Sequence, residues 1–128
     1  MEDMTPPRLV VIEDHPEHLD YLVTLLRRAG YVVAGFDRAV SALDYIAHCS
    51  ASLVITDVFM PEMDGFEVLK ALQQTRPELP LIAVSSATSG ERACFLAGIK
   101  TLGARAVFTK PLDSGALLGT VAALLSAD

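Results

Sequence analysis

Short apolar runs alternate with longer amphipathic stretches along nearly the whole chain. Continuous apolar runs predict strands that are covered on both faces, because half-exposed strands alternate apolar with polar residues. These strands are expected at 9–12, 31–36, 53–56, 81–84 and 104–108. Apolar residues at helical spacing predict helices between and after them, at 19–29, 38–48, 64–74, 90–102 and 113–126.

The order of these elements predicts the fold class. Five strand–helix units in strict alternation are typical of an α/β protein, so we expect a single doubly wound five-stranded parallel sheet with five helices. Right-handed crossovers place helices on both faces of such a sheet. Asp64 is expected to cap the third helix, with Glu67 completing a capping box. A flexible N-terminal segment, 1–7, is expected to precede one domain over 8–127.

Composition and charge narrow the class of protein. The 128 residues are 52% hydrophobic, which is enough for one domain with its own core. A net charge of −6 without a basic stripe argues against direct binding to nucleic acid. The longest uncharged stretch, 114–127, is too short to insert into a membrane. Cys49 and Cys94 lie far apart with no CxxC spacing, so we expect no disulfide framework, no zinc site and a cytoplasmic location.

Polar side chains suited to chemistry follow four of the predicted strands. The first, third, fourth and fifth strands are followed, in that order, by Glu13 with Asp14, by Asp57, by Ser85 and by Lys110. Ligands of open parallel sheets bind beyond the carboxyl ends of the strands, which lie at one edge. We therefore expect these five side chains to converge on one site.

The expected site combines three carboxylates with a hydroxyl and an ammonium group. Two carboxylates about 5 Å apart repel by about 3 kcal/mol at an effective dielectric constant near 20, and a hard cation among the oxygens offsets this. Mg²⁺ suits such a site because it binds one or two carboxylates and leaves positions for phosphate oxygens. Ser85 can donate a hydrogen bond to phosphate and Lys110 supplies a positive charge. Asp57 itself can attack phosphorus and carry an aspartyl phosphate.

Four stretches of the chain resemble, in order, the motifs of response-regulator receiver domains of two-component signalling. The acidic pair Glu13–Asp14 lies 44 and 43 residues before Asp57, and the stretch 57–67 resembles the most recognisable motif of the family along its full length. The stretches 80–86 and 103–111 resemble the segments that carry the hydroxyl residue and the lysine. The resemblance covers about 8–125 and implies a flavodoxin-like fold with strand order 2-1-3-4-5.

The resemblance also implies roles for single residues. Asp57 would accept a phosphoryl group from a sensor histidine kinase or a histidine phosphotransfer protein, in a reaction that requires Mg²⁺. Asp14 and Asp57 would bind the ion through their side chains, with Glu13 nearby or acting through water, and the backbone carbonyl of Phe59 would be a further ligand. The remaining two residues of the catalytic set, which would contact the phosphoryl oxygens, are Ser85 and Lys110.

The chain departs from the family pattern at several positions. Val107 stands where the family usually has an aromatic residue that responds to phosphorylation, and Phe108 follows it. The 25-residue separation of Ser85 from Lys110 is longer than expected, and the excess must lie within 86–103. The last helix has an uncharged outer face with two glycines, which predicts close packing against a downstream protein or a second copy through the fourth and fifth helices.

The expected chemistry is limited to Mg²⁺-dependent self-phosphorylation from a phosphodonor and slow self-dephosphorylation. Dephosphorylation should be slow because neither Phe59 nor Ala87, which flank the site, can hold an attacking water. A phosphatase that works through an aspartyl phosphate usually needs a second aspartate where Phe59 stands. A flavin or dinucleotide protein usually has a GxGxxG motif after its first strand, which this chain lacks. The remaining alternative is a degenerate receiver-like domain that acts as a constitutive protein-interaction adaptor.

The three histidines are expected to lie outside the chemistry. His15 follows the acidic pair and is interpreted as a solvated residue of the first helical turn. His18 and His48 stand near no recognisable group of ligating or catalytic residues along the sequence.

Overall fold

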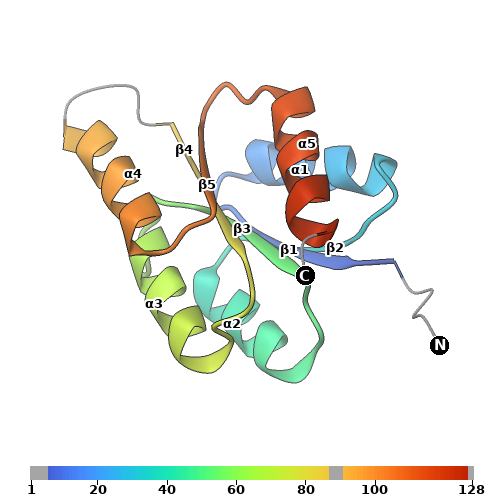
Figure 1. Cartoon of the computed structure of the whole chain (residues 1–128), viewed down its shortest axis with the longest axis horizontal. Helices are drawn as coiled ribbons and strands as arrows, with labels where there is room; N and C mark the ends of the chain where they lie inside the picture. The colour runs from blue at the N-terminus through green and yellow to red at the C-terminus, as the bar shows by residue number, and fades with distance from the viewer. Residues whose placement is uncertain (1–5, 87–90, 127–128) are drawn as a thin grey trace.

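The computed structural model describes residues 6–86 and 91–126, and Figure 1 shows a parallel sheet flanked by helices. The strands are β1 (Arg8–Ile12), β2 (Val32–Phe36), β3 (Leu53–Asp57), β4 (Leu81–Ser85) and β5 (Ala106–Thr109). The helices are α1 (Pro16–Arg28), α2 (Ala39–His48), α3 (Gly65–Thr75), α4 (Glu91–Leu102) and α5 (Ser114–Ser126). The flexible segment expected at 1–7 falls mostly on residues outside this description, and Pro7 already accepts a hydrogen bond from the Val32 amide (3.1 Å).

All strand pairs are parallel, and the strand order is β2-β1-β3-β4-β5. The predicted fold class and strand order are therefore confirmed. The order reverses between β1 and β3, which places their carboxyl ends side by side at the sheet edge where ligands of such folds bind.

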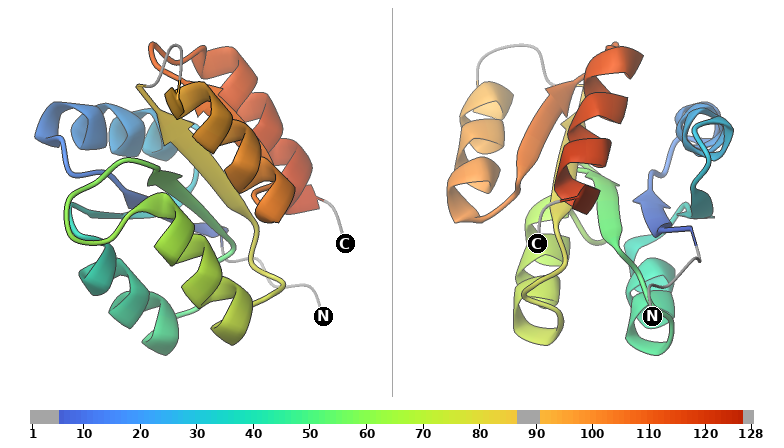
Figure 2. Two further views of the ribbon diagram at one scale, coloured as in Figure 1. Left: turned by 90° about the vertical axis from the view of Figure 1, so that its left-hand side faces the viewer. Right: turned by 45° about the vertical axis from the view of Figure 1, so that its right-hand side comes forward.

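Two hydrophobic clusters, one on each face, hold the helices to the sheet. Helices α1 and α5 cover one face, and α2, α3 and α4 cover the other, as Figures 1 and 2 show. Every residue of β3 and β4 is buried, which explains why these central strands read as unbroken apolar runs. The edge strand β2 has only one buried residue, Val33.

Element boundaries agree with the sequence predictions to within about three residues. Helix α1 begins at Pro16, before its apolar periodicity becomes visible, because proline is favoured in the first helical turn. Strand β5 begins at Ala106, two residues later than predicted. The capping box is confirmed: the Asp64 carboxylate accepts from the Glu67 amide, and the Glu67 carboxylate accepts from the Asp64 amide.

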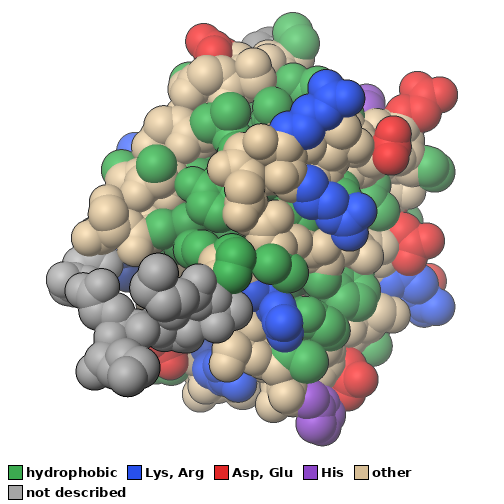
Figure 3. Space-filling model, turned by 90° about the vertical axis from the view of Figure 1, so that its right-hand side faces the viewer, with side chains coloured by type: hydrophobic (Ala, Val, Ile, Leu, Met, Phe, Trp, Pro, Cys, Tyr) green, Lys and Arg blue, Asp and Glu red, His purple; other side chains and the backbone are tan. Residues whose placement is uncertain are grey.

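Apolar side chains also reach the surface, as expected for a chain of this composition. Figure 3 shows one face on which apolar surface lies between basic and acidic side chains. The large exposed apolar residues within the described segments are Tyr21, Val32, Val40, Phe95 and Leu102. No helix in these segments is long and apolar enough to cross a membrane.

Gly65 permits a close contact between α3 and the loop that follows β3. A Cβ atom at Gly65 would lie 2.8 Å from the Val58 Cα and 3.1 Å from the Asp57 carbonyl oxygen, both of which are backbone atoms. The Gly65 amide also donates a hydrogen bond to the Val58 carbonyl (2.8 Å). The absence of a side chain therefore lets the start of α3 pack directly on the segment that carries Asp57.

Replacing Gly65 by alanine should destabilise the protein by about 2 kcal/mol, because the contacted backbone must move. Urea unfolding would measure the change. Gly119→Ala is the matched control: no atom of the described residues lies within 4 Å of a Cβ at this position in α5, so alanine should stabilise the protein by about 0.5–1 kcal/mol. Equal effects of the two substitutions would contradict the proposed close contact.

Candidate functional site

Three carboxylates meet at the carboxyl edge of the sheet. Glu13 and Asp14 directly follow β1, and Asp57 is the last residue of β3. One carboxylate oxygen from each residue can be chosen so that all three lie within 4.8 Å of one another. Glu13 is almost fully buried, Asp57 is 9% exposed and Asp14 is exposed. The structure thus brings together the acidic residues that the sequence predicted.

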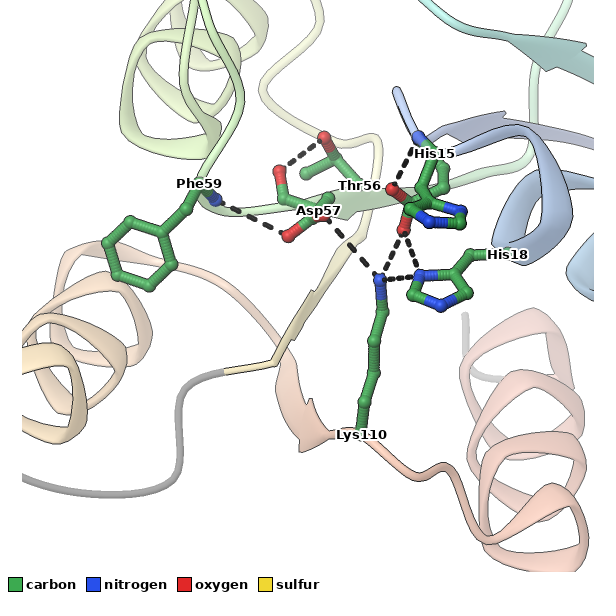
Figure 4. A network of polar contacts seen from close by, with 7 residues as sticks. His15, His18, Thr56, Asp57, Phe59 and Lys110 are labelled. Carbon is green, nitrogen blue, oxygen red and sulfur yellow. Dashed lines mark hydrogen bonds and ion pairs between the residues drawn. The ribbon is translucent and has the colours of Figure 1, made fainter.

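The Lys110 side chain extends from the loop after β5 into this acidic group (Figure 4). Its ammonium nitrogen lies 2.6 Å from Glu13 Oε1 and 3.6 Å from Asp57 Oδ2. Lys110 is tied to β4 as well, since its amide donates a hydrogen bond to the Ser85 carbonyl (2.8 Å). The shorter distance makes Glu13 the principal partner of Lys110 in this state.

Ser85 lies at the same edge as the last residue of β4. It pairs in register with Thr109 of β5, and its neighbour Val84 pairs with Asp57. Ser85 is fully buried, whereas Ser86 is exposed. Of the two adjacent serines, Ser85 is therefore the one enclosed among the strand ends.

The loop after Asp57 is anchored to the carboxylate through Phe59. The Phe59 amide donates a hydrogen bond to Asp57 Oδ1 (3.3 Å), and the ring points away from the carboxylates (Figure 4). The ring meets Phe95 of α4 edge to face, with centroids 6.1 Å apart, and Phe95 meets Phe66 of α3 in the same way at 6.2 Å. These three residues form an aromatic cluster beside the site.

Burial and mutual repulsion separate the acidities of the two buried carboxyl groups. Burial, followed by the negative charge of Glu13, raises the pKa of Asp57 to about 6. Burial also acts to raise the pKa of Glu13, but hydrogen bonding and the charge of Lys110, with a hydrogen bond from the His15 amide (3.0 Å), bring it below its ordinary value. Glu13 is thus the better stabilised anion, and Asp57 is the carboxylate whose charge is incompletely compensated.

The acidic group fits a hard divalent cation. Its donors are carboxylate oxygens, which Mg²⁺ prefers, and the incomplete compensation of Asp57 leaves negative charge for a cation to offset. Both Glu13 oxygens already accept hydrogen bonds, from Lys110 and from the His15 amide, so Asp14 and Asp57 are better placed to bind an ion directly.

One prediction from the sequence is wrong: His18 does lie among the residues that meet at the candidate site. Its Nδ1 atom lies 2.7 Å from the Lys110 ammonium and 3.9 Å from Glu13 Oε1. No pattern in the sequence indicates this contact, because His18 and Lys110 are 92 residues apart and His18 lies in a polar first turn. His15 is exposed, as expected, although its ring stacks on His18. His48, the last residue of α2, has polar contacts with Asp44 alone within the described part of the chain.

Val107 and Phe108 lie on opposite faces of the sheet. Val107 packs against the cluster covered by α2, α3 and α4, whereas Phe108 packs against the cluster covered by α1 and α5. The Phe108 ring therefore does not take the place of the aromatic side chain that the family usually has at position 107, on the α4 side of the sheet. The range 86–103, within which the extra length is expected, includes 87–90, and these residues, Ala87 among them, lie outside the described part of the chain.

A flavodoxin-like sheet with acidic residues just after β1 and at the end of β3, and with a lysine just after β5, defines the receiver class of signalling domains. The family model for the response regulator receiver domain matches residues 9–122, and the chain belongs to this family.

Curated relatives and solved structures agree with this assignment. The chain is 35% identical to the response regulator receiver protein CpdR of Brucella abortus, over 61% of this chain and 65% of CpdR. It is 31% identical to the DNA-binding transcriptional regulator NtrC of Rhizobium meliloti, over 96% of this chain and 25% of NtrC. The chain thus spans less than two thirds of these curated relatives.

Among solved structures, a response regulator receiver protein from Pseudomonas putida superposes with a TM-score of 0.84 at 28% identity, covering 94% of this chain and 99% of that one. A CheY-like receiver domain from Methanospirillum hungatei superposes with a TM-score of 0.83 at 27% identity, covering 94% of both chains. Similarity over nearly the whole length shows that the receiver fold accounts for almost all of this chain.

Proposed function

We propose that this chain is a phosphoacceptor receiver that takes a phosphoryl group on Asp57 from a histidine kinase or a histidine phosphotransfer protein, with Mg²⁺ as cofactor, in the cytoplasm. The observation that carries the proposal is the meeting of Glu13, Asp14 and Asp57 with the Lys110 ammonium at one edge of the sheet. This group combines a nucleophile, ligands for a hard cation and a positive charge for phosphoryl oxygens.

The residues of the chain have distinct parts in the proposed transfer. An Asp57 carboxylate oxygen forms a bond to phosphorus while the bond from phosphorus to the donor nitrogen breaks. Lys110 and Ser85 stabilise the charge on the phosphoryl oxygens. Mg²⁺, held by Asp14, Asp57 and the Phe59 carbonyl, with Glu13 acting through water, would offset the negative charge that the phosphoryl group brings.

The proposed response to phosphorylation is a shift between two conformations that changes the surface of α4, β5 and α5. This surface would meet a downstream protein or a second copy of the chain. It includes the half-exposed Phe95 and Leu102 of α4 and the outer face of α5, a helix without a charged residue. Sedimentation of phosphorylated and unphosphorylated protein over a concentration series would distinguish the two partners.

The alternative of a constitutive adaptor is not favoured. Three carboxylates held close together repel one another and so lower stability unless a cation offsets their charge. An adaptor that binds neither a cation nor a phosphoryl group would gain nothing from this arrangement. Here burial, and after it the negative charge of Glu13, raises the pKa of Asp57. We further propose that the chain has no enzyme activity beyond accepting and slowly losing its own phosphoryl group.

The proposal is tested by measuring intact mass after incubation with acetyl phosphate and Mg²⁺. The protein should gain one phosphoryl group, and chelation of Mg²⁺ with EDTA should prevent the gain. After donor removal the group should persist for much longer than seconds, because the Phe59 side chain offers no atom to hold an attacking water. Failure to gain mass would favour the adaptor, and loss within seconds would contradict the slow self-dephosphorylation.

A further inference from the structure

The Lys110 ammonium has a second close partner that the proposed phosphoryl transfer does not use. His18, in the first turn of α1, places Nδ1 2.7 Å from Lys110 Nζ (Figure 4). This distance is nearly as short as the 2.6 Å contact from Lys110 to Glu13, and shorter than the 3.6 Å contact to Asp57. The Lys110 ammonium is therefore held between Glu13, just after β1, and His18 of α1, with Asp57 on its remaining side.

The chemistry of the two groups defines the direction of this hydrogen bond. A lysine ammonium has three N–H donors and no acceptor, so His18 Nδ1 must present a lone pair to it. The ring is then the tautomer that carries its proton on Nε2. The His18 ring also stacks on His15, with centroids 4.1 Å apart and planes 18° apart.

We propose that His18 is a positioning residue for Lys110 in the phosphoryl transfer. Glu13 and His18 each accept one N–H of the ammonium, and the third N–H is left for Asp57 and then for an oxygen of the incoming phosphoryl group. The inference rests on the proposed function, because it assigns a role within that reaction.

The surroundings of Lys110 explain why a second hydrogen-bond acceptor besides Glu13 is needed to hold the ammonium in place. Lys110 also borders a largely apolar groove, which is lined by His18, Tyr21, Leu22, Lys110, Pro111 and Leu112. The lysine side chain is flexible and 14% exposed, so Glu13 alone would leave the ammonium free to turn into this groove toward water. His18 lies at the groove and keeps the charge directed toward Asp57.

The test compares three histidine variants in the rate of phosphorylation by acetyl phosphate with Mg²⁺. His18→Leu removes the acceptor and introduces an apolar side chain of similar size, and it should lower the second-order rate constant about tenfold, since a hydrogen bond from a charged donor is lost. His18→Asn keeps an oxygen acceptor close to the position of Nδ1, and it should restore the rate to within about twofold of wild type. His48→Leu, which changes an exposed histidine at the end of α2, should have no effect.

The outcomes separate positioning from a general structural role. Rescue by His18→Asn together with equal thermal unfolding midpoints for all variants would support the proposal. A wild-type rate in His18→Leu, or equal slowing in His18→Asn and His18→Leu, would overturn the positioning role while the proposed function stands. A wild-type protein that gains no phosphoryl group would overturn both.

Discussion

The Asp57→Asn variant should accept no phosphoryl group and, in metal-free buffer at pH 7, should be more stable than the wild type by about 2 kcal/mol. The loss of function follows because an amide is not a nucleophile toward phosphorus. The gain in stability follows because Asp57 is crowded by burial and by the charge of Glu13, which raise its pKa from 3.8 to about 6. A shift of about two pKa units corresponds to about 3 kcal/mol, and imperfect replacement by the amide reduces this.

The pH dependence of this gain has a defined sign. A carboxyl group with a raised pKa in the folded state binds its proton more tightly when folded, so ionisation weakens the fold. Wild-type stability from this group is complete below pH 3.8 and is lost as the pH rises through about 6. The advantage of Asp57→Asn should therefore grow by about 1 kcal/mol between pH 5 and pH 7, and then level off.

Urea unfolding at several pH values, with EDTA present, measures this advantage. Asp20→Asn is a matched control, because Asp20 is exposed on α1 and the same chemical change there should leave stability and phosphorylation unchanged. A gain of phosphoryl mass in Asp57→Asn would show that another residue is the acceptor. A stability difference that does not vary with pH would contradict the raised pKa of Asp57.

The Lys110→Met variant should lose about 3 kcal/mol of stability at pH 7 and should be phosphorylated about 10²- to 10³-fold more slowly. Glu13 is almost fully buried, so removing its cationic partner leaves a buried charge without compensation. The rate falls because the phosphoryl oxygens lose a positive charge that the fold holds in place. Methionine keeps most of the length of the lysine stem, so the change is mainly one of charge.

Lys100→Met provides the control for this prediction. Lys100 is exposed in the last turn of α4, and its replacement should leave both stability and phosphorylation rate close to wild type. The destabilisation by Lys110→Met should also shrink at lower pH, where Glu13 can take up a proton. A phosphorylation rate within tenfold of wild type would contradict the role assigned to Lys110.

The fold could be predicted from the sequence because a parallel sheet covered on both faces requires strands that are continuous apolar runs. Strands β3 and β4 are buried at every position and therefore contain apolar residues that no amphipathic helix would place in a row. The start of α1 was less visible, because Pro16 and the polar residues that follow it precede the periodic apolar positions. The apolar pattern predicts the start of β5 two residues too early because Ala104, although buried, lies before the strand.

The members of the acidic site could be predicted, but their pairing could not. Strand order determines that Glu13, Asp57 and Lys110 meet at one edge. Which carboxylate pairs with the lysine depends on burial and side-chain conformation. In the structure the Lys110 ammonium nitrogen lies 2.6 Å from Glu13 Oε1 and 3.6 Å from Asp57 Oδ2, so Glu13 is the closer partner by 1.0 Å. The contribution of His18 depends on how closely α1 packs on the loop after β5, which no local pattern records.

The aromatic cluster of Phe59, Phe66 and Phe95 gives this chain a built-in spectroscopic reporter. The protein has no tryptophan and only five phenylalanines, so labelling with fluorinated phenylalanine would give few resonances. The Phe59 amide is hydrogen-bonded to Asp57, and the Phe59 ring contacts the Phe95 ring. The resonance of Phe95, which lies on the surface of α4, should therefore shift when the Asp57 carboxylate changes.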